Sequence, residues 1–192
     1  MTGPADAAIR ELIASNPGQG TFEEYELVHD VVLERAPCAL LVFGVGRDSA
    51  LWLDANRGGT TVFLEDVREW ADFARANVPG IVVHDVRYRV RRFMWPFLRH
   101  APGLLWMKDL PPEVERRPWD VILVDAPRGT RWYRAGRMKS IYTASALAEH
   151  EGTVDVFVHD CHRAVERAAS DRFLRPERLV AQAGTMRHYR VA

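Results

Sequence analysis

The sequence predicts an α/β fold with one mostly parallel, doubly wound sheet whose strands are covered by helices on both faces. Short apolar runs alternate along the 192 residues with segments whose apolar side chains recur at helical spacing. The run Ala39–Phe43 shows no polar–apolar alternation, as expected of a strand that is buried on both faces. It leads directly into Gly44-Val-Gly46, where the backbone can turn tightly and approach a ligand closely.

The first part of the chain, residues 1–36, is predicted to be a helical segment of the single domain that spans residues 1–192. Two helices are expected there, at Ala5–Ser15 and at Thr21–Arg35. A Pro- and Gly-rich stretch separates them, and Thr21 with Glu24 has the spacing of a capping box at the start of the second helix.

Residues 37–192 are predicted to form the α/β core. Its strands are expected at Ala39–Phe43, Thr60–Leu64, Ile81–Asp85, Trp119–Val124 and Val154–Val158, with a terminal hairpin of Leu179–Ala183 and Met186–Val191. Its helices are expected at Ser49–Asn56, Val67–Asn77, Arg137–His150 and Cys161–Phe173. Arg87–Val114 is predicted to be irregular, and Arg128–Gly136 to be a loop.

Helix breakers and turn residues support these boundaries. Pro79-Gly80 follows the helix at Val67–Asn77, and Pro176 follows the last predicted helix. Gly184 lies between the two strands of the terminal hairpin. This hairpin refines the fold class to a Rossmann-like class I methyltransferase with a seven-stranded sheet, because ordinary dinucleotide-binding folds lack it.

Polar residues follow several of the predicted strands. In a parallel sheet, ligands bind at the carboxyl ends of the strands. The Gly44 turn, Glu65, Asp125 and Asp160 each follow a different strand. We therefore expect these four positions to converge on one crevice.

The turn after the first strand and the acidic pair after the second strand predict a nucleoside site. Glu65-Asp66 lies about twenty residues after Gly44, where such folds place the residue that accepts hydrogen bonds from a ribose. The third glycine of a dinucleotide fingerprint would fall at Ser49, which disfavours NAD and favours S-adenosylmethionine, a ligand without a pyrophosphate. The predicted cofactor residues are Phe43, Gly44, Gly46, Asp48, Ser49, Glu65, Asp66 and Asp85.

Asp125, His159 and Asp160 are the predicted catalytic residues, and two chemical interpretations remain open for them. Two carboxylates and one imidazole resemble a site for a divalent cation such as Mg²⁺, Mn²⁺ or Co²⁺. A metal ion there could lower the pKa of the hydroxyl that is methylated. Without a metal, Asp125 or His159 could act as general base. Each of the three could also have a structural role, as a helix cap or a core histidine.

A cluster of arginines interleaved with aromatic residues surrounds the predicted loop at Arg128–Gly136. Arginine forks bind carboxylates in a bidentate manner, and aromatic faces stack on sugar rings. The cluster is either a solvated basic surface or a site for an anionic saccharide. For the second case, the predicted substrate-binding residues are Arg131, Tyr133, Arg134 and Arg137.

Composition sets limits on partners and location. Lys plus Arg and Asp plus Glu both number 26, so the net charge is zero and nothing global favours nucleic acid as a partner. The two cysteines, Cys38 and Cys161, are expected to be reduced thiols of a cytoplasmic protein. No apolar run near the N-terminus fits a signal peptide or a membrane span.

Several blocks in register resemble the plant glucuronoxylan 4-O-methyltransferase family, also called the polysaccharide-biosynthesis domain family. The blocks are Phe43-Gly-Val-Gly-Arg-Asp-Ser-Ala-Leu-Trp52, Gly59-Thr-Thr-Val-Phe-Leu-Glu-Asp66, Asp125-Ala-Pro-Arg-Gly129, Ala135-Gly-Arg-Met138 and Asp155-Val-Phe-Val-His-Asp160. The resemblance implies S-adenosylmethionine as methyl donor, the 4-hydroxyl of a glucuronate side chain as acceptor, and assistance by a divalent metal.

The chain also departs from the plant pattern. The plant motif has His where Arg47 stands and usually Tyr where Thr130 stands, and the plant proteins carry a membrane anchor. These departures suggest a short bacterial-type relative whose acceptor is a glucuronate saccharide or a related anionic small molecule. Two alternatives stay open, a nicotinamide-dependent oxidoreductase and a non-catalytic partner in polysaccharide synthesis.

Overall fold

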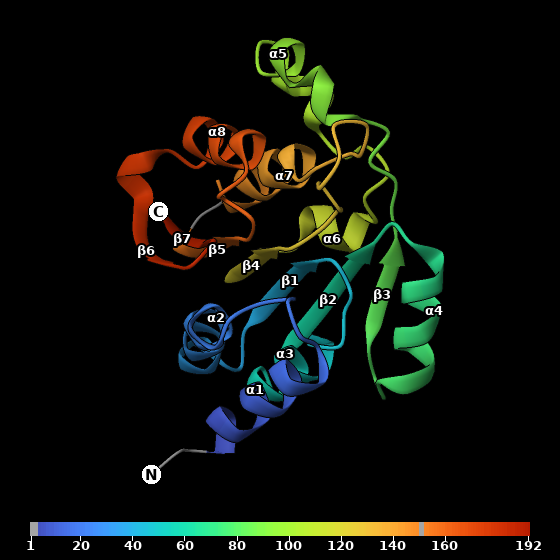
Figure 1. The fold of residues 1–192 in the computed structure, drawn as a ribbon, viewed down its shortest axis with the longest axis vertical. Helices are drawn as coiled ribbons and strands as arrows, with labels where there is room; N and C mark the ends of the chain where they lie inside the picture. The colour runs from blue at the N-terminus through green and yellow to red at the C-terminus, as the bar shows by residue number, and fades with distance from the viewer. Residues whose placement is uncertain (1–3, 150–151) are drawn as a thin grey trace.

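The computed structural model describes residues 4–149 and 152–192, and one seven-stranded sheet forms its centre (Figure 1). The strands are β1 (Ala39–Phe43), β2 (Thr60–Glu65), β3 (Val82–Asp85), β4 (Val121–Val124), β5 (Val154–Val158), β6 (Leu179–Ala183) and β7 (Met186–Val191). The α-helices are α1 (Pro4–Ser15), α2 (Phe22–Arg35), α3 (Ser49–Ala55), α4 (Arg68–Asn77), α5 (Trp95–Leu98), α6 (Pro112–Arg116), α7 (Met138–Ala148) and α8 (Ala164–Phe173). Three 3-10 helices are η1 (Arg92–Met94), η2 (Pro102–Leu105) and η3 (Pro176–Arg178).

The strand order is β3-β2-β1-β4-β5-β7-β6. Strand β1 pairs in parallel with β2 and with β4, and β5 pairs in parallel with β4. Strand β7 is antiparallel to both β5 and β6. The predicted α/β fold, with a mostly parallel sheet and a C-terminal antiparallel hairpin, is confirmed.

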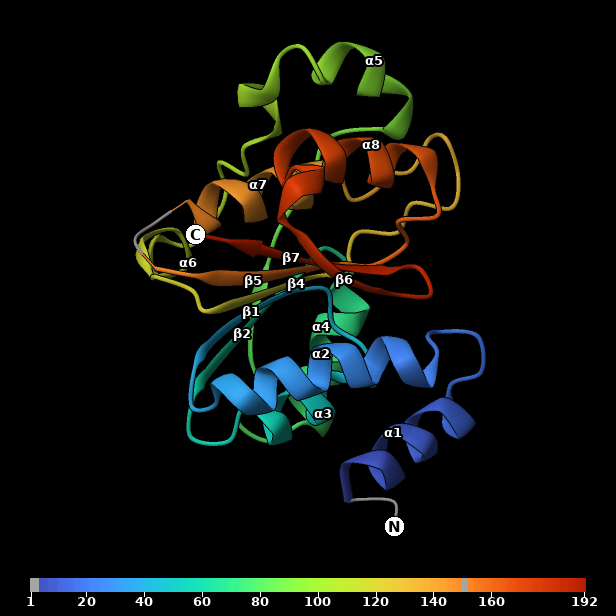
Figure 2. The ribbon, with the colours of Figure 1, turned by 90° about the vertical axis from the view of Figure 1, so that its left-hand side faces the viewer.

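Helices cover both faces of the sheet, which explains the uninterrupted apolar strands. Helices α2 and α3 lie on one face and α7 and α8 on the other (Figure 2). Successive residues of β1 point to opposite faces. Leu40 and Val42 accordingly belong to the core shared with α2, α3 and α4, whereas Leu41 and Phe43 belong to the core shared with α7 and α8.

The predicted capping box is confirmed at the start of α2. The Thr21 backbone N–H donates to Glu24 Oε2 over 2.9 Å, and the Glu24 N–H donates to Thr21 Oγ1 over 3.3 Å. These bonds satisfy two donors that have no partner within the helix. They also fix the orientation of the Glu24 side chain.

The structure differs most clearly from prediction in two segments, and one further prediction is not tested. Arg87–Val114 is not irregular throughout but contains η1, α5, η2 and α6, the last three with proline in their first turn. Helix α8 begins at Ala164 rather than Cys161. Asp160 has a φ of 64°, and the Arg163 N–H donates to the Asp160 carbonyl, so a turn precedes the helix. The predicted end of α7 at His150 lies outside the described residues.

Both cysteines are buried free thiols, as expected. Within residues 4–149 and 152–192, the helices all fall short of the length and apolar character that a bilayer span requires.

Candidate active site at the carboxyl edge of the sheet

A cleft of about 510 Å³ opens at the carboxyl ends of β1, β2, β4 and β5. This volume lies within the range of small-ligand sites in proteins. The cleft is lined by residues that follow these four strands and by the segment between α1 and α2. The expected convergence of the strand ends on one crevice is therefore present.

The turn after β1 brings backbone to the wall of the cleft. Gly44 has a φ of +116°, a conformation that residues with a side chain rarely adopt, and a Cβ at this position would lie 3.0 Å from Ala126 Cβ. The Gly46 N–H donates to Ser49 Oγ over 3.1 Å and so closes the turn. Glycine at Gly44 leaves room for a ligand that passes close to the main chain.

Glu65 lies at the end of β2 and is buried at the base of this turn. Its Oε2 accepts from the Val45 N–H over 2.8 Å, and its Oε1 accepts from the N–H groups of Asp66 and Val67 over 3.0 and 2.8 Å. Burial raises the pKa of this carboxyl, although the backbone donors oppose the shift. Oε2 retains acceptor capacity toward the cleft, which suits one hydroxyl of a ribose.

Asp125 and Asp160 share one buried guanidinium. Arg137 Nη2 donates to Asp125 Oδ1 over 2.6 Å and to the Asp125 carbonyl over 2.6 Å, and Nη1 donates to Asp160 Oδ2. Arg163 Nη1 also pairs with Asp160 Oδ2, at 2.6 Å. Burial by itself would raise the pKa of Asp125, but the charges of Arg137 and His159 lower it below its ordinary value.

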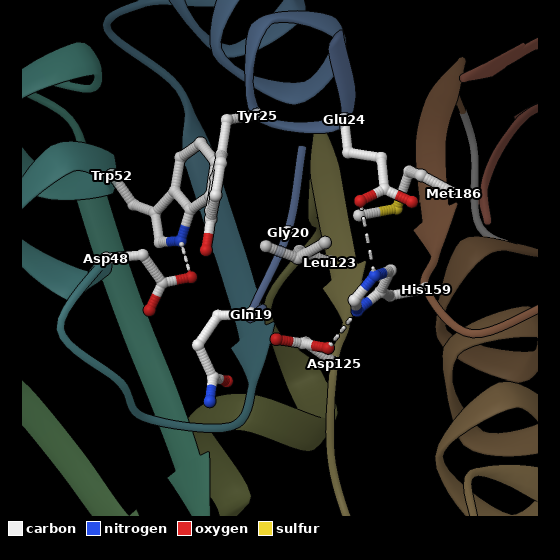
Figure 3. A pocket seen from close by; sticks show the side chains of 10 residues that line it. All are labelled: Gln19, Gly20, Glu24, Tyr25, Asp48, Trp52, Leu123, Asp125, His159 and Met186. Atoms are coloured by element: carbon white, nitrogen blue, oxygen red, sulfur yellow. Dashed lines mark hydrogen bonds and ion pairs between the residues drawn. The ribbon is translucent and has the colours of Figure 1, made fainter. Parts of the chain in front are cut away.

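His159 lies between two carboxylates from opposite sides. Its Nδ1 is 2.8 Å from Asp125 Oδ1, and its Nε2 is 3.6 Å from Glu24 Oε2 of helix α2 (Figure 3). Burial alone would lower the pKa of His159, but the two carboxylates outweigh it and raise that pKa to about 9. The imidazole is therefore a cation at neutral pH, which removes it as a general base there.

Glu24 is itself held by three segments of the chain. Besides its bond to Thr21, its Oε1 accepts from the backbone N–H and the hydroxyl of Thr185 in the β6–β7 turn, over 2.6 and 2.8 Å. Burial would raise the pKa of Glu24, but these bonds and His159 lower it to about 2. Helix α2 and the hairpin turn thus fix the far side of His159.

The loop between β4 and α7 is anchored from behind by a second buried charge pair. Arg92 Nη2 is 3.2 Å from Glu166 Oε2, and Arg92 Nη1 donates to the Gly129 carbonyl. The Arg137 N–H donates to Glu166 Oε1 over 3.3 Å. This loop is therefore ordered by the protein's own contacts.

Comparison with known proteins identifies the family. A family model described as IRX15/IRX15L/GXM matches residues 23–189. The chain belongs to this family. Arabinogalactan O-methyltransferase 2 of Arabidopsis thaliana is 35% identical and aligns with 90% of this chain and 67% of its own length. Glucuronoxylan 4-O-methyltransferase 2 of the same plant is 34% identical and aligns with 99% of this chain and 72% of its own length.

A further relative, Protein IRREGULAR XYLEM 15 of Arabidopsis thaliana, is 37% identical over 88% of this chain and 60% of its own length. Among solved structures, a methyltransferase-like protein from Silicibacter pomeroyi superposes with a TM-score of 0.52 and 18% identity. The match covers 91% of this chain and 86% of that protein. A methyltransferase from Geobacter sulfurreducens superposes with a TM-score of 0.53 and 10% identity, and the match covers 100% of this chain and 90% of that protein. These two show the shared fold. The named O-methyltransferase relatives identify this family member as a methyltransferase.

Most of the predicted site residues of this family member meet in the cleft. The predicted residues that line the cleft are Gly44, Gly46, Asp48, Glu65, Asp66, Asp125, Arg137, His159 and Asp160. Asp48 accepts from Trp52 Nε1 over 3.0 Å, and burial beside Asp125 raises the pKa of Asp48 to about 6. Ligand binding by these residues stays a prediction, but their common location is now established.

Several predicted residues lie outside the lining of the cleft. Phe43 is in the core, Ser49 is buried in the turn, and Asp85 is exposed and pairs with Arg75 over 3.1 Å. Arg131, Tyr133 and Arg134 are exposed on the loop beyond the cleft. Arg137 lines the cleft but is turned inward onto Asp125 and Asp160, so its guanidinium is not a free fork for a substrate carboxylate.

Other residues of the site were not predicted for it. Glu24 was noted only as a cap, and its approach to His159 depends on how α2 packs. Arg163, the N-cap residue of α8, pairs with Asp160, and Glu166 of α8 accepts from Arg92 and from the Arg137 N–H. Arg128 lines the cleft with an exposed side chain. In the sequence, the position of Arg128 directly after Asp125-Ala-Pro indicates that it lies near the site.

A divalent cation could be bound by the side chains of Asp125, His159 and Asp160. Each offers one ligand atom, and the three atoms lie within 4.8 Å of one another. The Arg137 guanidinium already lies against both carboxylates, however. A metal ion and this guanidinium therefore compete for the same oxygen atoms.

Replacing Arg137 by Gln is expected to strengthen Mn²⁺ binding at least tenfold, because the substitution removes the guanidinium that Asp125 and Asp160 share. Electron paramagnetic resonance of free Mn²⁺ measures this affinity without an activity assay. Arg128→Gln is the control, because Arg128 lines the same cleft but is not paired with Asp125 or Asp160. It should leave the affinity for Mn²⁺ unchanged. Equal or weaker Mn²⁺ binding by R137Q would contradict the competition.

Replacing Glu24 by Gln is expected to lower the pKa of His159 from about 9 by at least one unit, because one of its two carboxylate partners is lost. NMR titration of the imidazole measures this shift. The raised pKa also means that stabilisation by His159 is complete below its ordinary pKa of about 6.5 and is lost as the pH rises through 9. Unfolding free energy should therefore fall less between pH 7 and pH 10 in E24Q than in the wild type.

Glu23→Gln is the matched control, because Glu23 is the exposed neighbour on the same helix turn. An unchanged His159 pKa in E24Q would show that Glu24 does not contribute to the charge of the imidazole.

Proposed function

We propose that the protein is an S-adenosylmethionine-dependent O-methyltransferase that acts on a hydroxyl of a saccharide containing glucuronate. One observation supports this most strongly. Glu65 and the Gly44 turn line the same cleft as Asp125, so the residues proposed for the nucleoside and the carboxylate proposed as base are neighbours. The relatives named as glucuronoxylan and arabinogalactan O-methyltransferases support the class of acceptor.

When bound, S-adenosylmethionine would supply a sulfonium methyl group for transfer to an acceptor oxygen. Glu65 Oε2 would accept a hydrogen bond from its ribose, and the backbone of the Gly44–Gly46 turn would border its methionine part. Asp48 would offer its carboxylate to the ammonium group. Such contacts would fix the direction of approach, which is how positioning contributes to the rate.

Asp125 receives the hydroxyl proton in this proposal. Its Oδ1 is engaged by His159 and Arg137, and Oδ2 makes no hydrogen bond within residues 4–149 and 152–192. The protonated His159 and Arg137 hold the carboxylate in place and keep it ionised at neutral pH. Because the methyl transfer makes the acceptor oxygen strongly acidic, a carboxylate with a low pKa is sufficient to take the proton late in the step.

A divalent ion, where one is bound, would be held by Asp125, Asp160 and a deprotonated His159, and it would lower the pKa of the acceptor hydroxyl. Arg128 is an exposed cation that lines the cleft from the loop after β4, and it is the candidate partner for the glucuronate carboxylate. Arg131, Tyr133 and Arg134 lie further out on the same loop.

Glu65→Gln is expected to weaken S-adenosylhomocysteine binding 10- to 100-fold, as the loss of a hydrogen bond to a charged acceptor would. Titration calorimetry measures the affinity, and circular dichroism verifies the fold. Asp85→Asn is the matched control, because this exposed carboxylate ends the neighbouring strand outside the cleft. Absence of S-adenosylhomocysteine binding by the folded wild type would rule out the proposed cofactor.

Asp125→Asn is expected to lower kcat at least 100-fold, because general-base contributions to rate are typically of this size. S-adenosylhomocysteine affinity should change less than threefold, since Glu65 and the glycine turn are intact. The measurement is transfer of a labelled methyl group to glucuronate oligosaccharides. A kcat close to that of the wild type would remove Asp125 from the proton-transfer step.

A further inference from the structure

Three aromatic rings are exposed beside the cleft, and we call them the aromatic platform: Phe93, Trp132 and Tyr133. Their exposed fractions are 56%, 68% and 44%. The ring centroids of Phe93 and Trp132 are 5.6 Å apart, and those of Trp132 and Tyr133 are 5.8 Å apart. The rings are therefore contiguous, although they come from two segments of the chain that are far apart in sequence. Contiguous exposed apolar surface of this kind often marks a binding site.

The backbone beneath the platform is fixed although its rings are exposed. The Arg92 N–H donates to the Arg134 carbonyl over 2.9 Å, and the Phe93 N–H donates to the Trp132 carbonyl over 3.2 Å. Arg91 Nη1 donates to the Tyr133 carbonyl over 3.1 Å. The buried pair of Arg92 and Glu166 anchors the same two segments. A preorganised surface loses little conformational entropy when a ligand binds.

The platform continues the wall of the cleft. Arg128, Gly129 and Thr130 line the cleft, and Trp132 and Tyr133 follow them on the same loop. In Figures 1 and 2, this loop lies between the sheet edge and the α5 region. A ligand that leaves the cleft along the loop would therefore meet the aromatic rings.

The surroundings of the platform are basic. Neither Arg128–Gly136 nor Arg87–Arg99 contains an acidic residue. Arg131 and Arg134 are exposed beside the rings, and the Arg134 Cζ atom lies 5.7 Å from the centre of the Tyr133 ring. Planar guanidinium groups bind carboxylates, and the C–H-rich faces of sugar rings pack on aromatic faces. The combination is complementary to an anionic saccharide.

We propose that the aromatic platform binds sugar units of the acceptor that lie beyond the unit being methylated, so that the preferred acceptor is an anionic chain of several sugars. This proposal rests on the proposed saccharide methyltransferase activity. Single-stranded nucleic acid could also stack on aromatic rings, but the zero net charge of the chain disfavours it. A second copy of the chain is the other possible occupant, and the test below separates all three.

The test compares a long and a short probe. The long probe is a xylo-oligosaccharide that carries glucuronate, and the short probe is the methyl glycoside of glucuronic acid. The wild type, saturated with S-adenosylhomocysteine, should bind the long probe at least tenfold more tightly in titration calorimetry. Trp132→Ala should remove most of this difference, whereas Trp132→Phe should keep it. Affinities for S-adenosylhomocysteine and for the short probe should change less than twofold.

Phe97→Ala is the matched control, because Phe97 is equally exposed, at 63%, but does not belong to the stacked set. Equal affinity of the wild type for the two probes would overturn the platform while leaving the proposed function intact, provided that S-adenosylhomocysteine and the short probe bind. A wild type that binds neither of those contradicts the proposed function itself. Trp132-dependent binding of a single-stranded oligonucleotide, or a Trp132-dependent dimer in sedimentation, would assign the platform to another occupant.

Discussion

The candidate site depends on the buried guanidinium of Arg137. It contacts Asp125 at the end of β4 and Asp160 after β5, and its own residue begins α7. Removing one partner of a buried ion pair typically costs about 3–5 kcal/mol, because the remaining charge is left without compensation. The charge of Arg137 helps to hold the pKa of Asp125 below its ordinary value. The sequence separation of these residues means that the tertiary fold must be in place before the cluster exists.

A second set of contacts comes from the opposite face of the sheet. Glu24 of α2, itself held by Thr185 of the β6–β7 turn, lies against His159, while Arg137 holds Asp125 from the side of α7. Asp125 thus has one fixed oxygen atom and one oxygen atom without a hydrogen bond in the described chain. This arrangement orients a carboxylate toward the cleft without neutralising it, which is the electrostatic requirement for accepting a proton.

The two ends of the cleft differ in chemistry. The end formed by β1 and β2 offers backbone groups and three acidic side chains, namely Glu65, Asp66 and Asp48, beside one exposed arginine, Arg47. The loop after β4 offers arginines and exposed aromatic rings. Acidic groups suit hydroxyl and ammonium groups, and basic groups suit carboxylates, so the division matches a nucleoside at one end and an anionic acceptor at the other.

The sequence by itself determined the order of the strands and of the helices outside Arg87–Val114, the closing hairpin and the convergence of Gly44, Glu65, Asp125 and Asp160, because these follow from local apolar patterns and from the geometry of parallel sheets. The family could likewise be predicted from its ordered motifs. The tertiary structure alone decided the direction of the Arg137 side chain, the pairing of Glu24 with His159, and the position of Asp85 outside the cleft. Those features depend on how distant segments pack and on which charges meet in a buried space, and neither is encoded in local spacing.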